Sequence, residues 1–185
     1  YCGLGTHFLG NDQKADLLGG LTAQAWSGDE ASNHELVGSL LAGMRSSSEP
    51  PDAQIEPHIN IINEWMAGDD LATIHDRVMN WRGDDKWLAK AQDGFAHGSP
   101  LAATWIFRQL NQTREASLEA VFESELVLGC NIMRHPEFAE GVRALLVDKD
   151  RSPVWAYADL ASVPADVVET FFTAPVNMPA LGLPE

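Results

Sequence analysis

The chain has 185 residues, 45% of them hydrophobic, which suits one domain with a hydrophobic core of its own. Its 27 acidic and 12 basic side chains give a formal net charge of -15. A surface with this much negative charge repels nucleic-acid phosphates and anionic lipids. We therefore expect neither nucleic acid nor a membrane as a partner.

Two helices are predicted in the first third of the chain. Asn11-Asp12 can cap a helix that carries apolar residues at helical spacing, namely Ala15, Leu17, Leu18, Leu21 and Ala25. Ser27-Gly28-Asp29-Glu30 is typical of a capping box in which the serine oxygen accepts the N–H three residues on. A second helix is therefore expected from there to about Arg45. Pro50-Pro51 then interrupts the chain, and we expect an exposed loop there.

Four shorter amphipathic helices are predicted between residues 57 and 110. The first runs from Pro57 to Ala67 and ends at Gly68. The second follows Asp69-Asp70, and the third carries the apolar residues of 87–95. Ser99-Pro100 begins the fourth, with serine as the N-cap and proline at the first helical position.

Three longer or later helices complete the prediction. Ser117 is the expected N-cap of the longest, Leu118 to Met133, whose broad apolar stripe we expect to be central to the packing. A further helix begins at His135-Pro136 and runs to about Leu146, and a last one begins at Pro164. The proline-rich residues from Pro175 onward are expected to form a loose tail.

The sequence predicts no metal site. Its six histidines form no H-x-x-x-H pair and no cluster with cysteine that would place two ligands on one helical face. Cys2 and Cys130 have no C-x-x-C spacing, which is typical of free thiols in a reducing compartment.

Two pairs of charged residues have more than one interpretation. Glu137 and Glu140 could form a carboxylate pair for acid–base chemistry, but acidic groups in a first helical turn also complement the helix dipole, and this structural interpretation is favoured. Lys149 and Arg151 are candidate ligands for a phosphate, although alternating charges after a helix more often form a solvated turn. Tryptophans at helical spacing are expected in the core rather than on a stacking surface: Trp65, Trp81, Trp87 and Trp105.

Three motifs in order along the chain resemble one family. Residues 3–9 read GLGTHFL, residues 99–110 open on Ser-Pro-Leu and close on Arg-Gln-Leu, and residues 140–155 read EGVRALLVDKDRSPVW. Each is similar to a segment of 3-hydroxyisobutyryl-CoA hydrolases and their enoyl-CoA hydratase/isomerase relatives. The chain is thereby identified as a member of the crotonase superfamily, and as its C-terminal portion.

The resemblance implies a mainly α chain, the C-terminal helical domain of a crotonase-like α/β fold, with at most a short N-terminal strand. Residues 1–10 would end the crotonase core, 11–172 would form the helical domain, and 173–185 the loose tail. The oxyanion hole and the acidic residues that direct water would precede Tyr1. We therefore expect no catalytic residue in this chain, and Lys149 and Arg151 would contact a CoA phosphate.

The implied activity is hydrolysis of an acyl-CoA thioester, as in valine catabolism. An enoyl-CoA hydratase/isomerase is the alternative, and an independent helical interaction module is the second alternative. The implied partners are an N-terminal crotonase core and further copies of the chain, with acyl-CoA as substrate and no separate cofactor. The implied location is the bacterial cytoplasm or the mitochondrial matrix.

The chain departs from the family pattern at two places. Glu125-Leu126-Val127 lacks the arginine that relatives usually have there, and Ala156 follows Trp155 where relatives often have proline. The sequence therefore leaves the acyl group of the substrate open.

Overall fold

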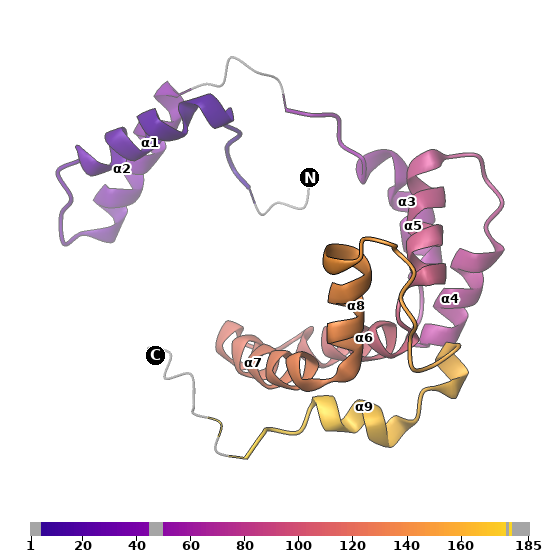
Figure 1. The fold of residues 1–185 in the computed structure, drawn as a ribbon. Coiled ribbons are helices and arrows are strands. Elements are labelled where there is room, and N and C mark those ends of the chain that lie inside the picture. The colour runs from indigo at the N-terminus through magenta and orange to yellow at the C-terminus, as the bar shows by residue number, and fades with distance from the viewer. Residues whose placement is uncertain (1–4, 45–49, 177, 179–185) are drawn as a thin grey trace. The chain divides into compact units, whose positions relative to one another are not determined.

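The computed structural model describes residues 5–44, 50–176 and 178, and all regular structure in these ranges is helical (Figure 1). The predicted mainly α class is confirmed, and residues 5–10 contain no strand. The chain divides after Ile62 into two compact units, residues 1–62 and 63–185, a boundary that the sequence did not predict. Most of the predicted loose tail and most of the loop before Pro50 lie outside the described residues.

The first unit contains two α-helices that pack against each other. α1 spans Lys14–Thr22 and follows the short 3-10 helix η1, Asn11–Gln13, while α2 spans Glu30–Gly43. A second 3-10 helix, η2, spans Glu56–His58 and leads into α3, Ile59–Trp65. In the described part of this unit no side chain is fully buried, so its helices have no closed hydrophobic core.

Two helix starts in this unit differ from the prediction. Asp29, not Ser27, is the N-cap of α2, because its carboxylate accepts from the Ser32 N–H at 2.8 Å. Ser27 instead accepts from the Asp29 N–H at 3.2 Å. A carboxylate is the stronger acceptor, so the helix begins two residues later than the serine motif indicates. Likewise, Asn11-Asp12 forms η1, and α1 begins after it.

The second unit begins with a helix pair that follows α3. α4, Leu71–Asn80, and α5, Lys86–His97, start at Asp70 and Asp85, whose carboxylates accept N–H groups of the first helical turns. Gly68, with φ of 95°, lies in the left-handed turn after α3, as the sequence predicts. The two helices pack against each other, and their buried apolar side chains are Ile74, Val78 and Leu88.

The tryptophans of the second unit largely pack as expected. Trp65 is buried and meets Trp81 edge to face, with ring centroids 5.8 Å apart. Trp105 packs against the core and stacks on Phe171. Trp87 is exposed, so the prediction of a core position is wrong for that residue.

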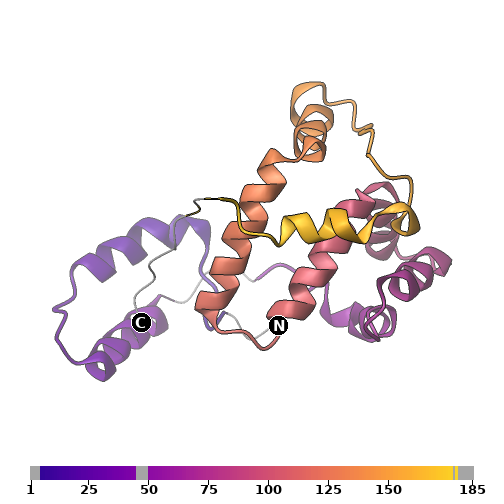
Figure 2. The ribbon, with the colours of Figure 1, turned by 90° about the horizontal axis from the view of Figure 1, so that it is seen from below.

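Three helices enclose the main core of the second unit. They are α6, Pro100–Thr113; α7, Leu118–Arg134; and α9, Ala165–Phe171. α9 lies across α6 and α7 in Figure 2 and contributes two of the four buried core residues, which are Leu101, Leu128, Val168 and Phe171. The short 3-10 helix η4, Leu160–Ser162, precedes α9 and packs on α6.

The long helix α7 is only partly central. Its N-cap is Ser117, whose hydroxyl accepts from the Ala120 N–H at 3.2 Å, as predicted. Leu128 is buried, but Leu118 and Met133 are each 71% exposed. The predicted apolar stripe is thus buried at its middle and open at both ends, because α8 and α9 cover only part of it.

After α7 the chain turns at His135 into α8, Pro136–Val142, which continues as one π-helical turn, η3, Arg143–Val147. The Asp148 N–H donates to the Arg143 carbonyl at 2.8 Å, a bond five residues back along the chain. The predicted end near Leu146 is confirmed, while the wider last turn is new. Among the described helices, none has the length and apolar character needed to cross a membrane.

Candidate functional site

The second unit contains a cavity of about 860 Å³ beside α8. Its wall comes from the end of α5, the start of α6, the end of α7, α8 with η3, and α9. The wall is mainly apolar and includes Leu101, Trp105, Ile132, Phe138, Leu145 and Phe171. Apolar walls with a few polar groups are typical of sites for organic ligands or for apolar side chains of a partner.

Three polar residues of the cavity wall, Ser99, His135 and Glu137, hydrogen-bond to one another or to the backbone and hold the chain together. The Ser99 hydroxyl donates to Glu137 Oε2 at 2.5 Å and accepts from the Ala102 N–H at 2.9 Å. His135 Nδ1 accepts from the Glu137 N–H at 3.3 Å. A serine nucleophile is normally activated by a histidine that takes its proton, whereas Ser99 donates to a carboxylate that also binds the Ala156 N–H. No hydrogen bond joins Ser99 to His135 in the described ranges, and the serine is largely buried.

Glu137 and Glu140 fasten an extended segment of chain to α8. The Ala156 N–H donates to Glu137 Oε1 at 2.8 Å, and the Val154 N–H donates to Glu140 Oε1 at 2.7 Å. Alternate N–H groups of the extended segment therefore meet successive carboxylates of the helix. This geometry favours the structural interpretation of the pair over acid–base chemistry. A proline in place of Ala156 could not donate the first of these bonds.

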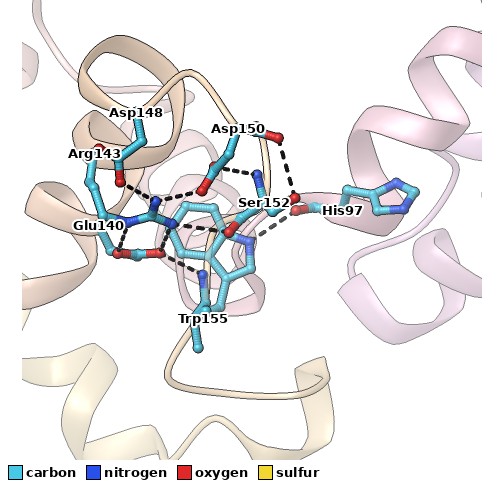
Figure 3. Close-up of polar contacts among 8 residues, drawn as sticks. His97, Glu140, Arg143, Asp148, Asp150, Ser152 and Trp155 are labelled. Atoms are coloured by element: carbon cyan, nitrogen blue, oxygen red, sulfur yellow. Dashed lines mark hydrogen bonds and ion pairs between the residues drawn. The ribbon is translucent and has the colours of Figure 1, made fainter.

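Trp155 ties the same segment to α5. Its indole Nε1 donates to the His97 carbonyl at 2.9 Å, across the end of α5 (Figure 3). The ring also passes close to Gly141, where an added Cβ would lie 3.4 Å from Trp155 Cη2. The glycine of the EGVR motif thus allows α8 and the indole to approach closely.

Arg143 is the centre of the polar network beside the cavity (Figure 3). Its Nε and Nη2 donate to the two oxygens of Glu140 at 2.9 and 2.8 Å. Its Nη1 donates to Asp148 at 2.7 Å and to Asp150 at 2.6 Å, and Nη2 also donates to the Ser152 carbonyl at 3.1 Å. One planar guanidinium therefore binds α8 and three alternate residues of the following loop.

These bonds shift the acidity of the groups involved. The Arg143 guanidinium, helped by the Val154 N–H, lowers the pKa of Glu140 to about 2. It also lowers the pKa of Asp150, while Glu140 and the two aspartates raise the pKa of Arg143. Glu140, Asp150 and Arg143 are therefore all ionised at neutral pH.

The two predicted phosphate ligands lie in the loop that Arg143 holds. Lys149 and Arg151 are exposed, with φ of 57° and 55°, in the left-handed region that residues other than glycine rarely adopt. Arg151 borders the cavity and its N–H donates to the Ala144 carbonyl at 3.0 Å, whereas Lys149 is not part of the cavity wall.

Sequence reasoning missed Arg143 and its partners. The signal in the sequence is the spacing of Glu140, Arg143, Asp148 and Asp150 around one basic residue, which is easily taken for a solvated turn. As for metals, the described residues contain no group of three or more His, Cys, Asp or Glu side chains that could hold an ion.

The described residues 63–176 therefore form a helical unit with a mainly apolar cavity, beside which Arg143 binds a loop of alternating charge. Comparison with known proteins gives its family. The model of the enoyl-CoA hydratase/isomerase family matches residues 1–172, and the chain belongs to that family. The crotonase-superfamily membership predicted from the three motifs is confirmed.

Relatives of known activity match over most of this chain. Human mitochondrial 3-hydroxyisobutyryl-CoA hydrolase is 29% identical over 174 residues, which are 92% of this chain and 43% of the human protein. The enzyme of the same name from Danio rerio is 35% identical over 103 residues, 55% of this chain and 27% of its own length. The chain thus spans less than half the length of these relatives.

Two solved structures have a similar fold. A carnitinyl-CoA dehydratase from Mycobacterium thermoresistibile is 26% identical, with a TM-score of 0.68 over 92% of this chain and 45% of its own. An enoyl-CoA hydratase from Rhodobacter sphaeroides is also 26% identical, with a TM-score of 0.60 over 78% of this chain and 43% of its own.

Proposed function

We propose that this chain is the C-terminal helical part of an acyl-CoA hydrolase of the 3-hydroxyisobutyryl-CoA hydrolase type. The observation that carries the proposal is the match of hydrolases with that name over 92% of the chain. In the complete protein, water would cleave the thioester to give a free acid and CoA, as a step of valine catabolism.

The catalytic residues would belong to an N-terminal crotonase core, in which backbone N–H groups stabilise the thioester oxyanion. The polar groups beside the cavity support this division of labour, because Ser99, Glu137 and Glu140 are all engaged in holding the chain together. Apolar side chains of η3 are available for contact with the core, since Leu145, Leu146 and Val147 are all exposed. Contacts with further copies of the chain would use the same kind of surface.

Lys149 and Arg151 would contact phosphate groups of CoA. Both are exposed cations in an otherwise acidic chain, and lysine and arginine are the usual donors to phosphate oxygens. Acyl-CoA would be the substrate, and the proposal includes no separate cofactor or metal. Relatives with mitochondrial names support the mitochondrial matrix as the location in a eukaryote, with the cytoplasm as its bacterial counterpart.

A second candidate is an enoyl-CoA hydratase or isomerase. The similarity to solved structures named as a hydratase and a dehydratase favours it. The two candidates differ in the product, because hydrolysis releases the CoA thiol and hydration leaves the thioester intact.

The test uses a polypeptide in which a crotonase core precedes this chain, beside residues 1–185 alone. With 3-hydroxyisobutyryl-CoA, we expect thiol release by the longer protein and none by residues 1–185. With crotonyl-CoA, loss of the conjugated double bond without release of the CoA thiol would show hydration. The proposed hydrolase activity would then be replaced by a hydratase activity. Turnover by residues 1–185 alone would contradict the assignment of catalysis to the core, and inactivity of both proteins would leave an interaction module.

A further inference from the structure

The loop of residues 148–152 has a backbone that needs outside support. Lys149 and Arg151 both have positive φ, at 57° and 55°, and neither is glycine. Such conformations cost free energy for residues with a Cβ and persist only where the surroundings fix them. The loop therefore depends on contacts that hold it in this shape.

Arg143 supplies most of that support. Its guanidinium binds Asp148, Asp150 and the Ser152 carbonyl, which are alternate positions along the loop. The same group is fixed to α8 by its two bonds to Glu140. Two local bonds add to this, because the Ser152 N–H donates to Asp150 Oδ1 at 2.9 Å and the Arg151 N–H donates to the Ala144 carbonyl.

The residues between these contacts carry the opposite charge. Lys149 and Arg151 are exposed, and neither side chain forms an ion pair or hydrogen bond with residues 5–44, 50–176 or 178. Arg143 thus binds the loop carboxylates of Asp148 and Asp150 (Figure 3). The two cations remain available to an external anion.

We infer that Arg143 is a positioning residue, which holds the 148–152 loop so that Lys149 and Arg151 together present two cations to a phosphate-bearing ligand. The inference rests on the proposed function, which takes that ligand to be CoA. Arg143 itself contacts no ligand in this scheme and acts only through the loop.

The variant Asp150→Asn gives the sharpest test, because two explanations predict opposite signs. Removal of a negative charge beside two cations should strengthen CoA binding if only the charges matter. If Arg143 positions the loop through Asp150, the same change weakens binding, by about fivefold to tenfold. Arg143→Lys keeps the charge but loses the planar fork, and we expect a similar loss.

The experiment is titration calorimetry, with CoA, of the polypeptide in which a crotonase core precedes residues 1–185, and every variant is made in that protein. The double variant with Lys149→Gln and Arg151→Gln measures the contribution of the cations, and Arg143→Lys added to it should have no further effect. Asp84→Asn, which removes an exposed carboxylate outside the network, is the matched control and should bind as the unmodified chain. Far-UV circular dichroism establishes that each variant is folded.

The outcomes separate two claims: that Lys149 and Arg151 contact a CoA phosphate, and that Arg143 positions them. If the Lys149 and Arg151 changes weaken binding but Arg143→Lys and Asp150→Asn do not, the positioning role is wrong and the phosphate contact stands. If the chain binds no CoA, or binds it equally without the two cations, the phosphate contact itself is wrong and the inference falls with it. A variant that does not fold is replaced by Asp148→Asn, which removes one loop bond and leaves the Glu140 pair in place.

Discussion

Arg143 joins groups that would otherwise repel one another. Glu140, Asp148 and Asp150 all point their carboxylates at the same guanidinium, and each contact is at most 2.9 Å. Only arginine has enough donors in one plane to bind all of them. The consequence is a local network that depends on ionised carboxylates and hence on pH.

We expect acid to weaken this network through Glu140. Its pKa falls from the ordinary 4.5 to about 2 in the folded chain because Arg143 stabilises the carboxylate. The stabilisation is therefore complete above the unfolded pKa and is lost as the pH falls from about 5 towards 2. Glu140→Gln removes the titrating group, so its urea-unfolding midpoint should be lower at neutral pH and change less over that range.

The measurement is tryptophan fluorescence during urea unfolding at a series of pH values. Glu123→Gln, in the exposed part of α7, is the control and should follow the unmodified chain. Parallel curves for the Glu140→Gln variant and the unmodified chain would show that the Arg143 pair contributes nothing to acid stability.

Helix α6 has two faces with different roles. Leu101 is 1% exposed and touches the core of α7 and α9, whereas Leu110, on the same helix, is 62% exposed. Gln109 is also buried and accepts from the Ser124 hydroxyl of α7 at 2.8 Å. The sequence pattern of α6 shows which residues are apolar but not which of them a neighbouring helix covers.

Leucine-to-alanine changes on α6 should therefore differ in cost. Leu101→Ala removes a fully buried side chain, and we expect it to lower the free energy of unfolding of the 63–185 unit by about 2–5 kcal/mol. Leu110→Ala is the matched control on the same helix and should change it by less than about 0.5 kcal/mol. Urea titration followed by circular dichroism measures both, and equal costs would mean that the two faces are not distinguished.

The two compact units differ in how much they bury. The described part of residues 1–62 has no fully buried side chain, whereas the unit of residues 63–185 has a core built from three helices. Hydrophobic burial is the main source of folding stability, so the first unit by itself has little to stabilise it. In the proposed complete protein, contact with the crotonase core would supply the missing burial.

Hydrogen exchange should reveal this difference directly. In residues 1–185 alone, we expect amides of α1 and α2 to exchange at rates near those of an unfolded peptide, and amides of α6 and α7 to be protected. Mass spectrometry of peptic peptides resolves the two sets. The same peptides in the protein that includes the core should gain protection in α1 and α2. Equal protection of α2 and α6 in the shorter chain would contradict a weakly held first unit.

The positions of the helices were predictable because their signals are local. Ser99-Pro100 and Ser117 begin α6 and α7 as expected, since a cap depends only on residues within one helical turn. Where two acceptors compete, as Ser27 and Asp29 do before α2, the same local rules did not identify the cap that forms. The family was also predictable, because its motifs are short and continuous in the sequence.

The sequence by itself therefore determined a helical, acidic member of the enoyl-CoA hydratase/isomerase family and the approximate bounds of most of its helices. Only the tertiary structure decided which groups its polar residues bind. Glu137 binds a backbone amide 19 residues away, and the Trp155 indole binds a carbonyl 58 residues away. Such partners depend on how helices pack rather than on neighbouring residues. For this reason Glu137 and Glu140, which in the sequence could be an acid–base pair, hold an extended segment against α8 in the fold.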